Sequence, residues 1–203
     1  MDRDAWDERY AGDEFVWSVE PNRFLVAEVG ALPPGRALDL ACGEGRNAIW
    51  LAERGWDVTG VDFSEVGLEK ARRLANARGV TVAWERADAT EYAPAPESFD
   101  LVIVMYLHLP EASRRVVFRS AAMAVAAEGT LLVVGHDITN PREGFGGPSD
   151  AAVLYGPEDV VADLNGLESV KAERVHRSVP TDDGEKIAID VLVRATRQTR
   201  DER

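Results

Sequence analysis

The sequence has little of several features that mark common protein classes. Its 203 residues include one cysteine, Cys42, so no internal disulfide can form. This agrees with a reducing compartment, and we expect a cytoplasmic protein. The first residues lack a signal-peptide pattern, and no apolar run approaches membrane-spanning length. The sequence therefore predicts no membrane partner.

Basic residues are also in the minority. The chain has 23 Lys and Arg against 36 Asp and Glu, a formal net charge of −13 at pH 7. Nucleic acids attract basic surfaces, so this balance predicts no nucleic-acid partner and favours a small-molecule substrate. No metal-ligand motif stands out, and we predict no metal site. The sequence leaves the oligomeric state open.

The order of the expected elements indicates the fold class. Strand patterns alternate with helical patterns five times, and two last strand patterns flank a turn at residues 182–184. This order predicts an α/β fold with a doubly wound, mostly parallel sheet of seven strands and a C-terminal antiparallel hairpin. After the first strand, we expect strands at 57–61, 80–84, 99–104, 131–135, 169–179 and 187–195, helices at 46–54, 65–78, 111–127 and 157–164, and a loop at 140–149. We further expect an N-terminal helical lid at 1–30, one main domain at 31–195 and a charged tail at 196–203.

A turn of small residues follows the first expected strand. Asp39 lies near the end of that strand, and Ala41, Gly43 and Gly45 follow at every second position before a helix begins at about Arg46. Glycine lacks a Cβ and tolerates positive φ, so a ligand can lie directly against this backbone. Ligands in open α/β sheets bind beyond the carboxyl ends of the strands. The pattern therefore predicts a ligand site at this turn.

Two kinds of nucleotide-like ligand fit the turn. Residues 43–48 match the dinucleotide fingerprint G-x-G-x-x-A, with Asp62 in the place of its ribose-binding acid. The same stretch also gives D-x-A-x-G-x-G from Asp39 onward. A buried acid inside the strand needs a partner, and it is out of place before a dinucleotide turn. A ligand with cationic groups suits it better.

This second pattern resembles motif I of the class I S-adenosylmethionine (SAM) methyltransferases. The likeness covers roughly Trp6 to Asp137, and the expected hairpin is compatible with it. The resemblance implies a Rossmann-like methyltransferase fold, SAM as cofactor and methyl transfer as the activity. It also implies that Asp62 binds both ribose hydroxyls and that Phe63 lies against adenine.

The resemblance extends to other strand ends and to the N-terminus. It implies that Asp88 and Ala89 bind the adenine ring and that the backbone near Met105 and Tyr106 lines the methionine end. The cofactor-binding residues implied in this way are Trp6, Tyr10, Trp17, Asp39, Ala41, Gly43, Gly45, Asn47, Asp62, Phe63, Asp88, Ala89, Met105 and Tyr106.

Two groups within the class are the most similar. Residues 39–47 resemble the bacterial tellurite-resistance methyltransferases, in which Gly usually stands where this chain has Ala41. The aromatic opening of Trp6, Tyr10 and Trp17 resembles that of the thiopurine methyltransferases, where matching aromatics close over SAM; an apolar cap over the core is the alternative. Both groups methylate sulfur, selenium or tellurium, which implies a thiol or a chalcogen oxyanion as acceptor.

Two histidines are candidates for catalysis. His108 and His136 follow the fourth and fifth expected strands, and a histidine can act as a base at neutral pH. A neutral hydroxyl or amine acceptor can require such a base, whereas a thiolate does not. The alternative for both residues is a structural role. His176 has no assigned role.

Three functions stay open. The leading hypothesis is a SAM-dependent methyltransferase that acts on a small-molecule acceptor. The others are an NAD-dependent oxidoreductase and a SAM-binding module without catalysis. The nearly complete set of cofactor motifs favours the first.

Overall fold

The structure, a computed structural model, describes residues 2–199. The last four residues of the expected tail, 200–203, and residue 1 of the expected lid lie outside the described residues. The elements are α1 (Arg3–Tyr10), α2 (Arg23–Val29), β1 (Arg36–Leu40), α3 (Arg46–Ala52), β2 (Asp57–Asp62), α4 (Glu65–Arg78), β3 (Ala83–Arg86), β4 (Phe99–Met105), α5 (Glu111–Ala124), β5 (Val125–His136), α6 (Asn140–Glu143), the 3₁₀ turn η1 (Ala151–Val153), α7 (Pro157–Val161), β6 (Glu168–Thr181) and β7 (Gly184–Thr196).

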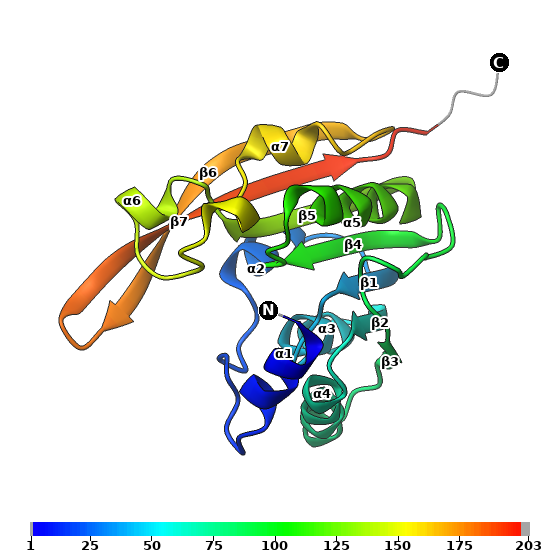
Figure 1. Cartoon of the computed structure of the whole chain (residues 1–203). Coiled ribbons are helices and arrows are strands. Elements are labelled where there is room, and N and C mark those ends of the chain that lie inside the picture. The colour runs from blue at the N-terminus through cyan, green and yellow to red at the C-terminus, as the bar shows by residue number, and fades with distance from the viewer. Residues whose placement is uncertain (1, 200–203) are drawn as a thin grey trace.

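A seven-stranded sheet in the order β3-β2-β1-β4-β5-β7-β6 runs through the molecule (Figure 1). Strands β1 to β5 are parallel, and β7 is antiparallel to both β5 and β6. The chain builds one half of the sheet outward from β1 and the other half outward from β4, so the strand order switches between these two strands. This arrangement confirms the predicted fold.

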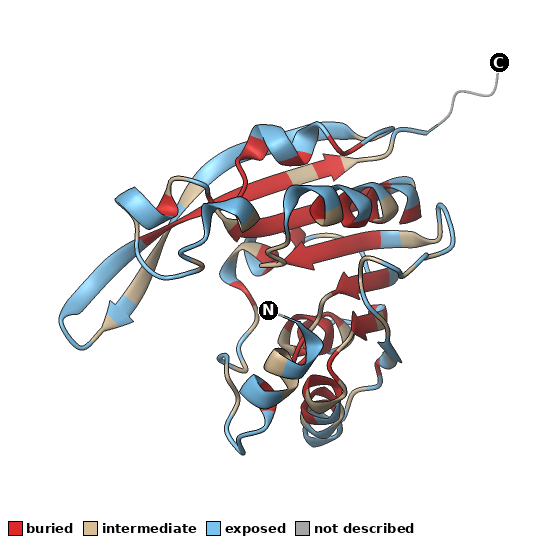
Figure 2. Ribbon diagram, viewed as in Figure 1, coloured by how far each residue is buried: buried red, intermediate tan, exposed pale blue. Residues whose placement is uncertain are grey.

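Helices cover both faces of the sheet, and β4 shows why. Its Val102 and Val104 pack in one apolar cluster with α5, whereas Leu101 and Ile103 pack in a second cluster with α2 and α3. Successive side chains of a strand point to opposite faces, so both faces of β4 are buried. Figure 2 shows the central strands buried along most of their length and the tip of the β6–β7 hairpin exposed.

Helix α4 has the predicted bounds because both of its ends are capped. The Ser64 hydroxyl accepts a hydrogen bond from the Gly67 N–H at 3.0 Å, and Gly79 ends the helix at φ 70°. The N–H of Val80 also bonds back to the Ala75 carbonyl at 3.1 Å. Residues 80–82 are therefore not in a strand, and the predicted strand 80–84 is wrong by about three residues: β3 covers Ala83–Arg86.

The predicted helix 111–127 is too long. It ends at Ala124, and β5 begins at once, because Val125 takes up extended geometry and pairs with Phe99. An irregular stretch with Glu128 at φ 62° then leads to Thr130, where regular pairing resumes. The alanine-rich sequence favours a helix here, and strand pairing overrides that preference.

Other differences from the predicted elements are smaller. Helices α3 and α7 end two and three residues early, at Ala52 and Val161, and the predicted loop 140–149 begins with the short helix α6. The N-terminal residues form α1, which packs against α4 (Figure 1). Within residues 2–199, no helix combines the length and apolar character needed to cross a bilayer.

Candidate active site

The small-residue turn lies where β1 ends and α3 begins. Ala41, Gly43 and Gly45 have φ values of 60°, 55° and 80°, so all three adopt left-handed backbone. A side chain costs about 1–2 kcal/mol in this region, so Ala41 is strained where the two glycines are not. Gly45 also abuts Trp84 and Ala71, at 2.6 and 2.7 Å from the place a Cβ would take. The turn thus requires glycine at position 45.

Asp39 is a buried carboxyl group at the end of β1. It is 1% exposed, and neither of its oxygens has a hydrogen bond of normal geometry to a described residue. Burial, together with the charge of Asp62, raises the pKa of Asp39 to about 8, although the N–H of Ala48 and the charge of Arg46 act in the opposite direction. Such a group is costly unless a cation or donor comes to it.

Asp62, at the end of β2, faces the same turn. Its Oδ2 accepts from the Gly43 N–H at 2.8 Å, and its Oδ1 accepts from the Ser64 N–H at 2.9 Å. Burial raises the pKa of Asp62, and these two N–H groups lower it. The carboxylate is therefore fixed in orientation, and it retains lone pairs for a ligand.

A buried ion pair fastens the N-terminal segment to the turn. Lys70 Nζ lies 3.1 Å from Glu44 Oε1, and both side chains are less than 5% exposed. Glu44 also accepts the N–H groups of Val16 and Trp17, at 3.1 and 3.2 Å, while Lys70 donates to the Glu14 carbonyl at 2.5 Å. Two side chains from the turn and α4 thus hold three residues of the lid.

The predicted aromatic residues lie in this lid. Tyr10 is buried and stacks on Trp6 at 5.3 Å, and its hydroxyl lies 2.8 Å from the place a Gly43 Cβ would take. Trp17 is 43% exposed, and the Arg9 guanidinium lies over both tryptophan rings. The structure therefore brings Tyr10 directly onto the turn and leaves Trp17 at the surface.

The other predicted cofactor residues are less closely grouped. Met105 is buried at the end of β4 and Phe63 is half-buried after β2. Asp88 is exposed, with Oδ1 bonded to the N–H and hydroxyl of Thr90, and Ala89 is half-buried beside it. The side chain of Asn47 points instead to the lid and accepts the Asn22 N–H at 2.9 Å.

A second polar cluster lies at the carboxyl end of β5. His136 Nδ1 lies 3.0 Å from Asp190 Oδ1, close but without the angle of a normal hydrogen bond. Asp190 Oδ2 accepts from the Tyr106 hydroxyl at 2.7 Å and from Arg177 Nε at 2.8 Å. Burial favours a raised pKa for Asp190, but the contacts with His136, Arg177 and Tyr106 hold it below its usual value. The cluster thus centres on a buried, ionised carboxylate.

The second candidate base, His108, lies next to His136. The two rings stack at 5.3 Å, and His108 Nε2 accepts the backbone N–H of His136 at 3.0 Å. Burial, followed by the neighbouring His136, lowers the pKa of His108 to about 3. The ring is therefore neutral, and its Nε2 lone pair is engaged by the backbone.

Sequence reasoning missed five charged residues of this region: Arg46, Glu44, Lys70, Arg177 and Asp190. Arg46 lies at the start of α3, near Asp39, Glu44 and Tyr106, and burial lowers its pKa. The signal for Asp190 was present in the sequence, since it is the one charged residue of the run Ile187–Val193. A charge within an apolar strand indicates a buried, paired group.

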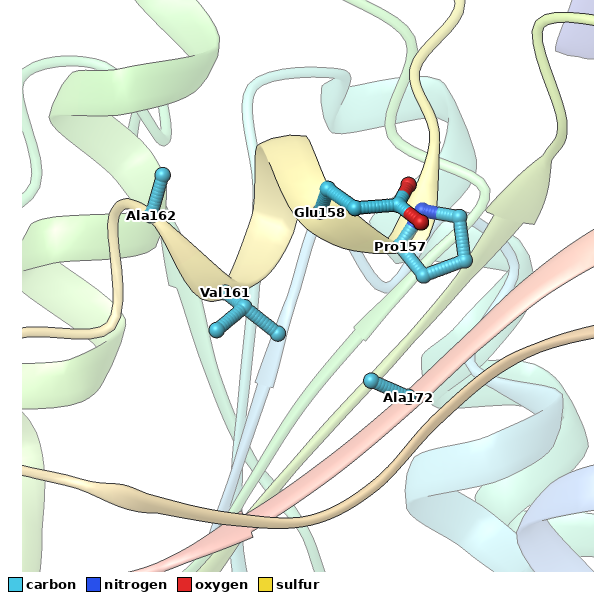
Figure 3. A pocket seen from close by; sticks show the side chains of 5 residues that line it. All are labelled: Pro157, Glu158, Val161, Ala162 and Ala172. Atoms are coloured by element: carbon cyan, nitrogen blue, oxygen red, sulfur yellow. The ribbon is translucent and has the colours of Figure 1, made fainter.

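Two cavities lie outside these clusters. One of about 390 Å³ lies between α7 and β6 and is lined by Pro157, Glu158, Val161, Ala162 and Ala172 (Figure 3). The other, about 250 Å³, lies beside α4 and β3. Among the described residues, no three His, Cys, Asp or Glu side chains form a candidate metal site.

Comparison with known proteins gives one family and several relatives. Residues 37–129 match a family model described as a methyltransferase domain. The chain is 34% identical over 143 residues to the ubiquinone biosynthesis O-methyltransferase of Hahella chejuensis, covering 68% of this chain and 58% of the relative. It is 37% identical over 119 residues to the trans-aconitate 2-methyltransferase of Sinorhizobium medicae, covering 57% and 44%. A tRNA (uracil(54)-C(5))-methyltransferase of Pyrococcus abyssi is 34% identical over 48% of this chain and 28% of its own length.

Solved structures share the fold over nearly the whole chain. The N-methyltransferase NodS of Bradyrhizobium japonicum, in complex with S-adenosylhomocysteine, has a TM-score of 0.72 at 19% identity and covers 97% of this chain and 98% of its own. A structure described as the conversion of a disulfide bond into a thioacetal group during echinomycin biosynthesis has a TM-score of 0.77 at 23% identity, with 97% and 93% covered. TehB from Haemophilus influenzae has 0.72 at 15% identity, with 97% and 67% covered. The chain spans about half the length of the curated relatives it matches.

Proposed function

We propose that this chain, whose residues 37–129 match a model of a methyltransferase domain, is a class I SAM-dependent methyltransferase that moves a methyl group from SAM to a small-molecule acceptor. The observation that carries the proposal is the unpartnered Asp39 carboxyl group beside a turn of left-handed backbone. SAM supplies an activated methyl group when bound, and the protein supplies position and electrostatics.

The residues at the turn fit the charges of SAM. Its amino-acid end is a zwitterion, and the Asp39 carboxyl group and the Arg46 guanidinium lie near each other at the turn. We propose that Asp39 faces the ammonium group and Arg46 the carboxylate. Asp62 is proposed to bind the ribose hydroxyls, because a fixed carboxylate accepts two hydrogen bonds at once.

The lid is proposed to cover the cofactor. Tyr10 lies against the turn and Trp6 stacks on Tyr10, and aromatic faces attract a methyl sulfonium. We propose that the rest of the cofactor site is lined by Gly45, Phe63, Ala89 and the backbone near Met105. These residues follow the carboxyl ends of neighbouring strands. Asp88 completes this set through the adenine amino group. We propose that Asn47 affects cofactor binding indirectly, through its hydrogen bond to the backbone of the lid.

The acceptor has two proposed classes. The resemblance to tellurite-resistance and thiopurine methyltransferases favours a thiol or a chalcogen oxyanion. The polar cluster around His136 favours instead an acceptor with a neutral hydroxyl group. The named relatives differ among themselves in what they methylate.

Calorimetric titration with SAM, S-adenosylhomocysteine and NAD tests the proposal. We expect micromolar binding of both SAM species and none of NAD. Asp62→Asn is expected to weaken binding about 10- to 100-fold, since it weakens charge-assisted hydrogen bonds. Asp57→Asn, at the exposed opposite end of β2, is the matched control and should leave binding unchanged. Binding of NAD with silence from both SAM species would overturn the proposal.

A further inference from the structure

Asp190 is held in one orientation by residues from three parts of the fold. It is 0% exposed on β7, and its Oδ2 is occupied by the Tyr106 hydroxyl from the segment after β4 and by Arg177 from β6. Tyr106 is itself in left-handed backbone, at φ 58°, a strained geometry that concentrates at functional sites. With Oδ2 fixed in this way, Oδ1 is left pointing to His136 Nδ1.

His136 has one edge toward Asp190 and the other toward a loop. Its side chain is 12% exposed, and Nδ1 faces Oδ1 of Asp190 at 3.0 Å. Neither atom has another hydrogen-bond partner among residues 2–199. A proton on Nδ1 is therefore the arrangement that the carboxylate favours, and it leaves the lone pair on Nε2.

Gly147 lies against the ring of His136, on the side that includes Nε2. A Cβ at this position would lie 2.5 Å from His136 Cδ2 and 2.8 Å from Nε2, and the residue has φ 75°. Any side chain would press on the nitrogen that carries the lone pair. The loop after α6 thus approaches His136 with bare backbone.

We propose that His136 is the general base of the transfer reaction, that Asp190 is its positioning residue, and that the acceptor is a small molecule with a neutral hydroxyl group. This inference rests on the methyltransferase function proposed above. His108 is not the base, because its Nε2 accepts a backbone N–H. The charged and titratable groups that face His136 are Asp190 from β7, Tyr106 and His108 from the segment after β4, and Arg177 from β6.

The proposed step is balanced. The acceptor hydroxyl gives its proton to His136 Nε2, and the electron pair of its oxygen forms the bond to the methyl carbon. The carbon–sulfur bond breaks with its electron pair left on sulfur, so the sulfonium becomes a neutral thioether. The imidazolium is stabilised by Asp190 and then returns its proton to water.

This base separates the two acceptor classes. A thiol with a pKa near neutrality is already ionised and gains little from a base, whereas a hydroxyl does not ionise near pH 7. Of these two classes, only the hydroxyl acceptor requires a base such as the His136–Asp190 pair. The geometry therefore favours a hydroxyl acceptor over the thiol or chalcogen oxyanion.

The first measurement is the tautomer of His136 by ¹⁵N NMR on protein saturated with S-adenosylhomocysteine. The chain has three histidines, so each ring can be assigned with one His→Gln variant. We expect the Nδ1–H tautomer for His136 in the native protein and its loss in Asp190→Asn. An Nε2–H tautomer in the native protein, or one that Asp190→Asn leaves unchanged, would overturn the proposal.

The second measurement compares phenol with thiophenol as acceptors. We expect His136→Gln to lower the kcat for phenol about 100-fold or more and that for thiophenol less than about threefold, since general-base catalysis contributes about 10²–10⁴-fold. Asp190→Asn should lower kcat for phenol with little change in KM. His176→Gln, which alters an exposed histidine of β6, is the matched control and should match the native protein.

The outcomes separate this inference from the proposed function. Binding of S-adenosylhomocysteine is measured first for every variant, and its absence in the native protein counts against the methyltransferase proposal itself. With binding intact, methylation of thiophenol alone, or of neither probe, overturns the hydroxyl assignment. An equal loss for both probes in His136→Gln overturns the role as a base.

Discussion

At the scale of single residues, the structure holds two carboxyl groups in unlike environments at one turn. Asp62 has two N–H partners, whereas Asp39 has no hydrogen bond of normal geometry among the described residues. A fold selected for stability alone has no use for the second arrangement, because an unpaired buried acid is costly. It is understandable as a feature that favours the ligand-bound state, in which a cation lies beside Asp39.

The first prediction concerns Asp39→Asn in the ligand-free protein. The pKa of Asp39 is about 8 in the fold, against 3.8 for an unperturbed Asp side chain, so the fold favours the protonated form. The native protein should therefore lose stability as the pH rises from about 4 to about 8, and Asn, which stays neutral, should not share this loss. At pH 7 we expect the variant to be more stable by up to about 4 kcal/mol, at about 1.36 kcal/mol per pH unit.

Urea unfolding at pH 5 and pH 8 measures this difference. The advantage of Asp39→Asn should be larger at pH 8, while Asp57→Asn should track the native protein at both values. The same Asp39→Asn variant should bind SAM more weakly. A stability difference that is the same at both pH values would contradict the prediction.

At the scale of elements, the N-terminal lid depends on a buried ion pair more than on its own helix. Helix α1 has eight residues, too few to be stable in isolation. Glu44 and Lys70 bind the backbone of residues 14–17 that follows it, and Ser64 Oγ bonds Asp7 at 2.5 Å. The residues that recognise the lid are thus themselves part of the turn and of α4.

The second prediction is that Lys70→Met releases the lid. Glu44 would be left buried without its cation, which typically costs about 3–5 kcal/mol. We expect faster tryptic cleavage near Arg9 and faster hydrogen exchange at the Val16 and Trp17 amides. The double variant Glu44→Gln/Lys70→Met should recover much of the loss, and Lys186→Met, in the exposed hairpin, is the control lysine. Unchanged exchange at both amides would argue against a clamp.

Much of the element order was accessible from the sequence, and the exceptions have physical causes. Helix α4 has caps that can be read in the sequence, Ser64 and Gly79, and its bounds were predicted correctly. The start of β5 was not predicted correctly, because the extended conformation of Val125 depends on pairing with Phe99 and not on local preference. Element boundaries that depend on neighbouring residues, such as helix caps, can be predicted from the sequence. Boundaries that depend on pairing with a distant strand cannot be predicted in this way.

The candidate site divides in the same way. The turn at Asp39 to Gly45 is a continuous motif and was found from the sequence. The partners of His136 were not, because Asp190 and Arg177 lie more than 40 residues away in the chain and reach it only through strand register. The side chain of Asn47, placed with the cofactor from its motif position, bonds the lid backbone instead.

At the scale of the whole molecule, one antiparallel strand brings the second cluster to the cofactor edge. Strands β1 to β5 end at that edge, and β7 begins there because it runs the other way, so Asp190 pairs with His136 across β5 and β7. A sixth parallel strand would place its early residues at the opposite edge. The hairpin therefore supplies Asp190 and Arg177 to the proposed site and also forms the edge of the sheet.

The last prediction concerns RNA, since one relative bears the name of a tRNA methyltransferase. This chain corresponds to 28% of that relative's length, and its net charge of −13 repels a phosphate backbone. We expect no binding of transfer RNA in fluorescence anisotropy at 0.15 M salt, with protein concentrations up to about 10 μM, in the presence or absence of S-adenosylhomocysteine. Lowering the salt to 0.05 M strengthens non-specific binding of RNA to basic surfaces. Because this chain is acidic, we expect little change in its binding of transfer RNA. A dissociation constant below about 1 μM that weakens steeply with salt would instead reveal a local basic surface and an RNA acceptor.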